Sequence, residues 1–445
     1  MIEESKIISF LSSATRSLKP IIEDSKAFEI VLSTLEFIEN SYRHSKFKSL
    51  LNRILELSYI ESFWNAFDST NEKFKDGLMG KVEVFNPIFL FPLVYLAFLS
   101  ISTYRISNLG LLSITIGLIF FVLGVVSSKR IEFGKIYLDE HSDKIAILFL
   151  ALGTFYLVLD ILRAGTIPIL NPEARRGLSV LYTYIASLIV PGGILLISLI
   201  GVKLRRGEMS LREARMSAIA VTLGTTFLIT LLGYRTQLVV SLLGCILAMY
   251  FMKLIGIAEI GVSSLAIVAA VSFVGYYRAI TQGATLGVWE IIGGRIGLTL
   301  SVYDHLIDRF WVFGANRGST LLATFSSFLP FIPGPWIGPR TIVARVFGVT
   351  HISMTSTLLG TIVLDFGIPG IIVFMFVLGF VVGMSYYAMR LTRSALCTAM
   401  YSLLIAYTLV GIETGLVDFN VAIFFIGSFL ILYNSRKVED TKLNH

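Results

Sequence analysis

Long apolar runs alternate with short polar segments from about residue 86 to near the C-terminus, and this pattern predicts a series of membrane-spanning helices. A helix needs about 20 mostly apolar residues to cross the hydrocarbon core of a bilayer, whereas a strand of an outer-membrane barrel needs only about ten. The fold class expected is therefore an all-α polytopic membrane protein with about ten transmembrane helices. The predicted spans are 87–104, 109–127, 145–162, 180–201, 216–232, 236–255, 260–277, a broken span at 353–387, 395–411 and 417–433.

Residues 1–85 have a different pattern, in which apolar side chains recur at helical spacing between polar ones, as at Phe28, Val31, Leu32 and Leu35. We expect a small helical region here that packs on itself or on the membrane surface, with docking of a partner as the alternative. The first long apolar run begins only near Pro87, so no signal peptide is expected. The predicted domains are a cytoplasmic region 1–85, a transmembrane domain 86–434 and a cytoplasmic tail 435–445.

Composition agrees with a membrane protein, since the mean hydropathy is +0.78 and charged residues make up only 15% of the chain. The net charge of +7 does not come from the N-terminal region, where acidic residues outnumber basic ones. The basic excess therefore belongs to the membrane part, and nucleic acid is not expected as a partner. Cys245 and Cys397 lie in separate apolar runs and are expected to be buried.

Basic residues orient the predicted spans. The turn with Lys203, Arg205, Arg206, Arg212 and Arg215 should be cytoplasmic by the positive-inside rule, and alternation then places both termini in the cytoplasm. In this topology no lysine after Lys81 lies on the outer face, which carries arginine alone. Because a guanidinium binds phosphate or carboxylate through two parallel hydrogen bonds, such a surface favours anion recognition over simple snorkelling at span ends. The outer arginines are Arg105, Arg163, Arg175, Arg176, Arg235, Arg278, Arg295, Arg309, Arg317, Arg340 and Arg345.

The largest polar interruption is an extracytoplasmic loop at about 278–352. An amphipathic helix is predicted from 283 to 313, with Ser301, Asp304, His305, Asp308 and Arg309 on one face. We expect His305, with Asp304 alongside, to be the catalytic base and His351 to be the second candidate. The next apolar stretch, 319–329, is too short to span. The proline-rich segment 330–340 carries Trp336, which could stack on a sugar or anchor the chain at the interface.

The end of this loop leads into the broken span. Hydroxyl residues from Thr350 to Thr357 should begin a helix whose free backbone N–H groups, with Arg345 and His351, face outward and bind an anion, although ordinary helix capping is the alternative. The run from Asp365 to Gly370 is expected to break the span. It places a carboxylate at membrane depth, for which arginine is the expected partner.

Several short motifs occur together in a set order: Asn86-Pro87, Gly165-Thr166-Ile167-Pro168 before Arg175-Arg176-Gly177, Gly233-Tyr234-Arg235-Thr236-Gln237, Arg295, Ser353-x-Thr355 up to Gly360, and Asp365-Phe366-Gly367-x-x-Gly370. Over roughly residues 86–433 the chain resembles the O-antigen and oligosaccharide repeat-unit polymerases (Wzy-type). The resemblance implies a GT-C-like polymerase/ligase architecture with one large outer loop. It also implies that repeat units carried on polyprenyl pyrophosphate are joined on the outer face of the cytoplasmic membrane.

The same resemblance implies roles for particular residues and partners. The arginines expected to bind pyrophosphate or glycan are Arg163, Arg175, Arg176, Arg235, Arg295 and Arg345, to which the loop analysis adds Arg309, Arg340 and Trp336. The expected partners are the polyprenyl-pyrophosphate-linked oligosaccharide, the lipid bilayer, and a chain-length regulator or flippase of the same pathway. No cofactor is expected. Metal independence is also expected, because the sequence has no Asp-x-Asp and the first outer loop, 105–110, is short.

Three other functions remain open on the sequence. An O-antigen ligase would share the topology, the lipid-linked donor and the large loop, and would differ only in its acceptor. A flippase or other transporter would be expected to carry ionisable residues along a central path and often two matching halves, whereas the charges here gather at predicted outer ends. A non-catalytic scaffold would not account for an outer face with arginine alone.

Overall fold

In the computed structural model of this chain, the residues that the structure describes are 64, 67–71, 85–130, 142–169, 171, 174, 177–265, 288–326, 337–350 and 353–415. The chain forms two compact units, Met1–Thr70 and Asn71–His445. In the first unit, residues 64 and 67–70 are helical. The predicted helices before residue 64, the predicted last span 417–433 and the tail 435–445 lie outside the described residues.

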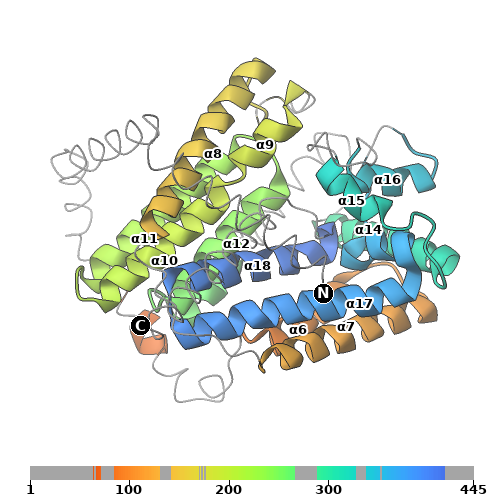
Figure 1. Ribbon diagram of the computed structural model, residues 1–445, viewed down its shortest axis with the longest axis horizontal. Coiled ribbons are helices and arrows are strands. Elements are labelled where there is room, and N and C mark those ends of the chain that lie inside the picture. Colours follow the sequence, from red (N-terminus) through yellow and green to blue (C-terminus); the bar gives the residue numbers. More distant parts are fainter. Residues whose placement is uncertain are drawn as a thin grey trace, which may run out of the picture. The chain divides into compact units, whose positions relative to one another are not determined.

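All regular elements in the described part of the second unit are helices, which confirms the all-α prediction (Figure 1). Their bounds are α6 Pro87–Ile101, α7 Asn108–Ser128, α8 Ser142–Ala164, α9 Val180–Ala186, α10 Ile189–Arg205, α11 Leu211–Thr230, α12 Arg235–Phe251, α14 Val288–Phe310, α15 Ser319–Ser326, α16 Pro339–Val346, α17 Thr357–Thr392 and α18 Ala395–Thr414.

Within the described ranges, 5 helical stretches are long and apolar enough to cross a membrane. They are Asn108–Ser128, Ser142–Ala164, Val180–Arg205, Thr357–Thr392 and Ala395–Thr414, and two shorter apolar helices are Pro87–Ile101 and Arg235–Phe251. These helices support a multi-pass membrane protein, while the number of ten spans stays a prediction. The predicted span 180–201 is divided between α9 and α10, because the chain makes a turn at Ser187 and Leu188.

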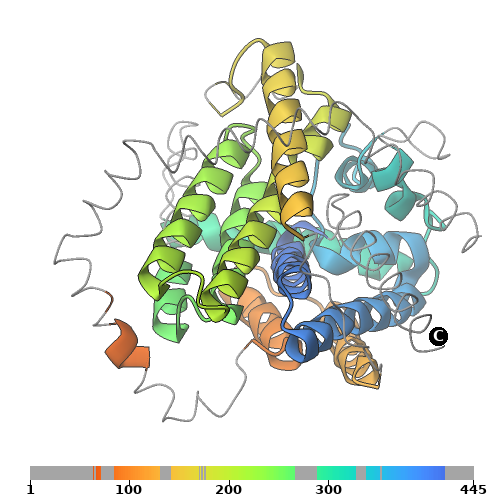
Figure 2. The ribbon, with the colours of Figure 1, turned by 60° about the vertical axis from the view of Figure 1, so that its left-hand side comes forward.

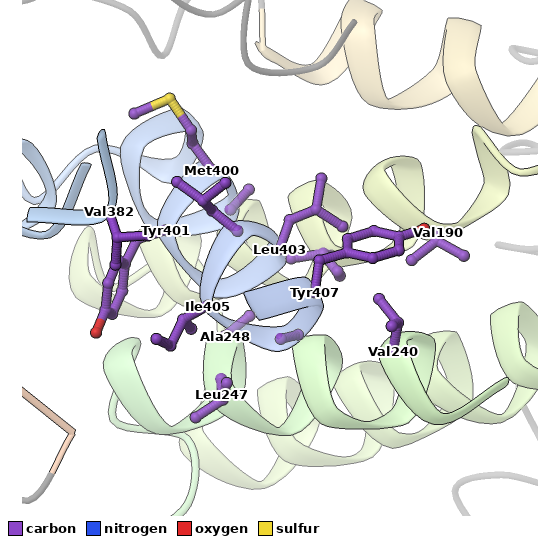
Figure 3. Packing of buried hydrophobic residues seen from close by; sticks show 14 of the residues in the cluster. Val190, Val240, Leu247, Ala248, Val382, Met400, Tyr401, Leu403, Ile405 and Tyr407 are labelled. Carbon is purple, nitrogen blue, oxygen red and sulfur yellow. The ribbon is translucent and has the colours of Figure 1, made fainter. Parts of the chain in front are cut away.

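Helix α18 lies at the centre of the second unit and packs against α10, α12 and α17 (Figure 2). Most of its side chains are buried, as Figure 3 shows for Tyr401, which points toward Val382, and Tyr407, which points toward Val190. The hydroxyl group of Tyr407 donates to Oε1 of Gln237 at 2.7 Å. A buried hydroxyl therefore has a partner, and the beginning of α12 is joined to α18.

Helices α7 and α17 form the closest pair and lie side by side in Figure 1. Two glycines make this approach possible, since a Cβ atom at Gly124 would collide with the carbonyl oxygen of Phe376, and one at Gly379 with the carbonyl oxygen of Phe121. Small residues at a helix crossing let the backbones come together, and the resulting van der Waals contact is what associates helices in a membrane. The crossing therefore depends on both glycines.

Helix α17 is kinked at Gly367, whose backbone angles are φ 65 and ψ −153. These values suit glycine because a Cβ atom would be strained there. Pro369 follows two residues later and cannot donate a backbone hydrogen bond. The predicted break within this span is confirmed.

Candidate functional site

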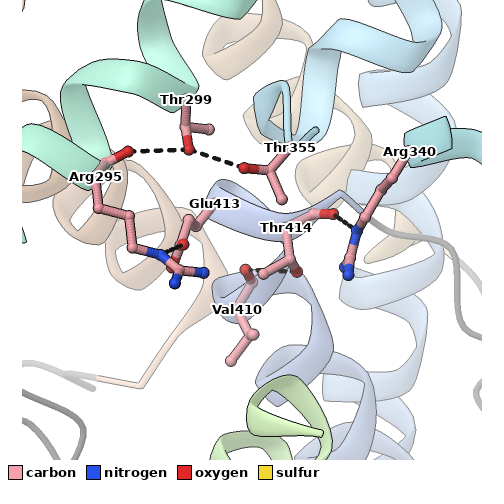
Figure 4. A network of polar contacts seen from close by, with 7 residues as sticks. All are labelled: Arg295, Thr299, Arg340, Thr355, Val410, Glu413 and Thr414. Carbon is pink, nitrogen blue, oxygen red and sulfur yellow. Dashed lines mark hydrogen bonds and ion pairs between the residues drawn. The ribbon is translucent and has the colours of Figure 1, made fainter. Parts of the chain in front are cut away.

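Arginines from two separate helices meet at the C-terminal end of α18 (Figure 4). Nε of Arg295, on α14, lies 2.6 Å from Oε1 of Glu413. Nε of Arg340, on α16, donates to the carbonyl oxygen of Thr414 at 3.0 Å. The last carbonyl groups of a helix carry partial negative charge, so a guanidinium is stabilised at this position. We call Arg295, Arg340, Glu413 and Thr414 the arginine site.

Local sequence places both arginines. Pro339 is the first residue of α16, where its fixed φ suits a helix start, and Arg340 follows in the first turn. The carbonyl oxygen of Arg340 accepts from the backbone N–H of Met354 at 3.1 Å, which ties α16 to the segment before α17. On α14, Thr299 lies one turn after Arg295, and its hydroxyl oxygen is 3.0 Å from that of Thr355. Three segments, α14, α16 and the residues just before α17, thus converge on the end of α18.

The arginine site carries a net positive charge. It contains two guanidinium groups and one carboxylate, and the Nη atoms of Arg295 and Arg340 make no hydrogen bond with any of the described residues. The side chain of Arg295 is 52% exposed. Each guanidinium can donate five hydrogen bonds, so both retain donors that an anion could use.

His305 lies further along α14 and is exposed. Its Nδ1 atom is 2.8 Å from the carbonyl oxygen of Ser301. A carbonyl oxygen only accepts, so Nδ1 carries the proton, and in the neutral ring Nε2 keeps a lone pair. The ring of Phe347, just after α16, stands at 69° to the imidazole with the ring centres 6.2 Å apart. His305 therefore presents a basic nitrogen on the side of α14 that meets the end of α16.

Asp304 does not share the exposed face of His305, and the predicted five-residue face is wrong for this position. The carboxylate is buried and accepts from the Tyr104 hydroxyl group at 2.9 Å. It also accepts from the backbone N–H of Ser107 at 2.9 Å and from its hydroxyl group at 2.6 Å. Adjacent residues of a helix point about 100° apart, so Asp304 turns toward α7 while His305, Asp308 and Arg309 remain outside. Partial burial, and then the bond to Asp304, raise the pKa of Tyr104.

The prediction that an arginine is the partner of Asp365 is also wrong, because the partner is the N-terminus of a helix. The side chain is 1% exposed, and its two oxygens accept from the backbone N–H groups of Thr320 at 3.1 Å and Leu321 at 2.9 Å. These N–H groups belong to the first turn of α15, which lacks partners within the helix and favours negative charge. The buried carboxylate thereby fixes α15, a helix of 8 residues that is too short to span.

The start of α17 also differs from the prediction. Ser356 and Thr357 are buried, with 3% and 1% of their surface exposed, so these two residues do not face outward. The anion site expected at this helix start is therefore not formed by them.

The other predicted residues lie as follows. Arg163 is exposed in the last turn of α8, Arg235 begins α12, and Arg309 and Arg345 are exposed on α14 and α16. Arg175, Arg176, Trp336 and His351 lie outside the described residues. Of the predicted arginines, the structure brings Arg295 and Arg340 together at one site.

Two acidic residues make structural contacts that the sequence analysis did not predict, one between α8 and α9 and one at the arginine site. Asp160 is fully buried in α8 and accepts from the backbone N–H of Ser179 and the hydroxyl group of Thr183, each at 2.7 Å. It thus holds the start of α9 against α8, at the two ends of the loop that contains Arg175 and Arg176. Glu413 pairs with a residue 118 positions away, a relationship that only the folded chain reveals. Among the residues with described positions, no group of three or more His, Cys, Asp or Glu side chains could hold a metal ion.

Comparison with known proteins places this architecture in a family. The family model described as "Putative O-antigen polymerase" matches residues 83–425, which include all of the described helices from α6 to α18. An uncharacterised protein of Methanocaldococcus jannaschii is 27% identical over 367 residues, covering 80% of this chain and 95% of that protein. No solved structure matches this chain. The match over most of the chain shows that this protein belongs to the O-antigen polymerase family.

Proposed function

We propose that this protein joins oligosaccharide repeat units carried on polyprenyl pyrophosphate into a polysaccharide, on the outer face of the cytoplasmic membrane. The family match and the apolar helices support a membrane glycosyltransferase-type enzyme. The observation that carries the finer proposal is the arginine site, where Arg295 and Arg340 lie on either side of the end of α18 (Figure 4). A diphosphate leaving group needs fixed cationic donors of this kind.

The reaction that we propose is an inverting glycosyl transfer. A hydroxyl oxygen of the acceptor sugar attacks the anomeric carbon of the donor, and the bond from that carbon to the pyrophosphate oxygen breaks. The pyrophosphate leaves with the electron pair, and the proton of the hydroxyl group passes to Nε2 of His305. Negative charge grows on the leaving phosphate, so its stabilisation by guanidinium groups should dominate the rate. Each charge-assisted hydrogen bond contributes about 1.5–3 kcal/mol.

Other residues have proposed roles around this step. Asp304 is reassigned to positioning, because its bonds to Tyr104 and Ser107 hold the helix that carries His305. His351 remains the second candidate for the base, and Trp336 a candidate for stacking on a sugar. Further binding of pyrophosphate or glycan is proposed for Arg163, Arg175, Arg176, Arg235, Arg309 and Arg345.

Polymerisation of a purified repeat unit linked to polyprenyl pyrophosphate, in lipid vesicles, tests the proposal. Wild type should make long products. Arg340→Lys keeps the charge but loses the planar fork, so the rate should fall about 10- to 100-fold, the equivalent of one charge-assisted bond. His305→Ala should lose about 100-fold or more.

Arg206→Lys is the control with the same change of side chain, because Arg206 forms an ion pair with Glu208 at 3.8 Å and caps α10 away from the arginine site. Its activity should equal that of wild type. If wild type transfers the glycan only to a different, non-repeat acceptor, the protein is a ligase. If it moves the substrate across the bilayer without extending it, the protein is a transporter and the proposal fails.

A further inference from the structure

Three consecutive large apolar side chains are exposed in the turn between α14 and α15. Trp311, Val312 and Phe313 are 49%, 41% and 80% exposed. Phe366 and Leu322, on the adjoining α17 and α15, are 43% and 48% exposed. We call these five residues the apolar patch. Phe366 lies on the candidate span Thr357–Thr392, but the turn that carries Trp311, Val312 and Phe313 is not part of a helix long enough to span a membrane. Lipid contact by a spanning helix therefore does not account for the exposure of the turn.

The backbone beneath the apolar patch is held in place by the kink of α17. The carbonyl oxygen of Trp311 accepts from the backbone N–H of Ile368 at 2.9 Å, and the carbonyl oxygen of Leu364 accepts from Ala315 at 2.8 Å and from Asn316 at 3.1 Å. A Cβ atom at Gly367 would lie within 2.9 Å of three carbonyl oxygens in the turn, those of Phe310, Trp311 and Val312. The close approach therefore requires glycine, and it holds the backbone of the turn against the kink of α17.

Asp365 fixes the other border of the apolar patch. Its carboxylate accepts from the first N–H groups of α15, and Leu322 lies in the same turn of that helix. The ring of Phe366 packs against Gly318, 3.1 Å from the position of a Cβ atom there. Asp365, Phe366 and Gly367 thus hold the apolar patch in one arrangement. A ligand that binds a rigid surface loses less conformational entropy in the protein than one that must first order a flexible surface.

Cationic residues border the apolar patch at both ends of the turn. Arg309 precedes it and Arg317 follows it, and both side chains are exposed. Neither forms an ion pair with the residues whose placement is described, although the exposed Asp308 adjoins Arg309. The guanidinium carbon of Arg309 lies 5.6 Å from the centre of the Phe310 ring. An apolar surface between two guanidinium groups matches an anionic amphiphile, whose hydrocarbon covers the apolar side chains while its phosphate contacts the arginines.

We propose that the apolar patch binds the first isoprene units of a polyprenyl pyrophosphate, with Arg309 and Arg317 placed to contact its phosphate groups. This inference rests on the proposed function, since it assigns the carrier lipid of the acceptor repeat unit to a place on the chain. Arg295, which is proposed to hold the pyrophosphate of the donor, lies about 21 Å earlier along α14, so the two carriers occupy separate sites. His305 lies one turn before Arg309 on the same exposed face of α14. The lipid end of the acceptor would thus be held one helical turn from the proposed base.

Binding of two sugar-free probes tests the proposal. Protein in nanodiscs of phosphatidylcholine is titrated with farnesyl pyrophosphate and with inorganic pyrophosphate. Wild type should bind the prenylated probe at least tenfold more tightly, since the prenyl chain covers apolar side chains that are otherwise exposed. Phe313→Ser should remove about tenfold of that preference and leave the affinity for inorganic pyrophosphate unchanged. Phe313→Leu, which keeps apolar area, should retain most of the preference.

Phe89→Ser is the matched control, since Phe89 on α6 is 59% exposed and is expected to face bulk lipid. It should not change the preference for the prenylated probe. The proposal is overturned if wild type shows no preference, or if Phe313→Ser and Phe89→Ser reduce binding equally, which would mean that the apolar patch is a general contact with the bilayer. Neither probe carries a sugar, so a failure of polymerisation alone would count against the proposed function and not against this site.

Discussion

Nε of Arg295 lies 2.6 Å from Oε1 of Glu413, in an ion pair that joins α14 to the last turn of α18. Both side chains are partly exposed, at 52% and 32%. A carboxylate in contact with a proposed phosphate-binding arginine offsets part of the positive charge that an incoming anion would meet at the Nη atoms. The pair therefore holds Arg295 in place and also competes with the substrate for it.

Glu413→Gln is expected to bind pyrophosphate more tightly than wild type, because the amide keeps the shape of the side chain but removes the competing charge. Exposed ion pairs are worth about 0.2–1 kcal/mol, so the expected gain is up to about fivefold in the dissociation constant of inorganic pyrophosphate, measured by calorimetry in nanodiscs. Glu208→Gln, which breaks the exposed pair with Arg206, is the control and should leave binding unchanged. Weaker binding by Glu413→Gln would show that Glu413 serves only to position Arg295.

Asp304→Ala should destabilise the protein by about 2–3 kcal/mol, because it leaves Tyr104 and Ser107 without the buried acceptor of a charged hydrogen-bonding group. Thermal unfolding in detergent measures this loss. Asp308→Ala is the control, since Asp308 is exposed on the same helix and its truncation should change stability little.

The same contact predicts a change in the titration of Tyr104. Burial and the bond to Asp304 raise its pKa above the ordinary value of 10.0, so folding favours the neutral phenol. The stabilisation is present below pH 10 and is lost as the pH rises through the raised pKa. Asp304→Asn should lower the pKa of Tyr104, as followed by NMR of labelled tyrosine and assigned with Tyr104→Phe. An unchanged pKa would mean that burial alone sets it.

The parts of this fold that the sequence predicts are those determined by local pattern. Apolar runs locate α7, α8 and α18 to within a few residues, and the sequence from Asp365 to Gly370 marks the kink of α17, since glycine and proline act on their own backbone. The amphipathic pattern also locates α14. Its pattern is less informative about single residues, because a change of one position turns a side chain by about 100° and separates the buried Asp304 from the exposed His305.

Contacts between distant segments account for what the sequence does not predict. Arginine is the usual partner expected for a carboxylate at membrane depth, but the fold satisfies Asp365 with the N-terminus of a short helix. The convergence of Arg295, Arg340 and Glu413 depends on three helices whose packing no local pattern specifies. The arginine composition of the predicted outer face pointed to anion binding, but it did not distinguish these two arginines from the others.

Asp365→Ala should loosen the turn that carries the apolar patch. It removes the acceptor for two N–H groups of α15, a loss of about 1–3 kcal/mol, and hydrogen exchange of residues 311–326 should accelerate. Asp365→Asn keeps one acceptor oxygen and should have a smaller effect. Exchange elsewhere, for example in α10, provides the internal control. If exchange in 311–326 does not change, the carboxylate does not hold α15 in place.

The crossing of α7 and α17 leads to a stability prediction with an internal control, because Gly124 is crowded by neighbouring backbone whereas Gly224 has open space around it. Gly124→Ala places a methyl group against the backbone of Phe376, which cannot move aside as a side chain could, and overpacking of this kind costs about 1–3 kcal/mol.

Gly224, inside α11, has no neighbouring atom within 4 Å of a Cβ position. Gly224→Ala should therefore be neutral or stabilise the protein by up to about 1 kcal/mol, since alanine is the better helix former. Thermal unfolding of the two variants, in the same detergent, should shift in opposite directions or leave only Gly124→Ala destabilised. Equal shifts would mean that α7 and α17 do not cross at these residues, and the fold around α17 would have to be revised.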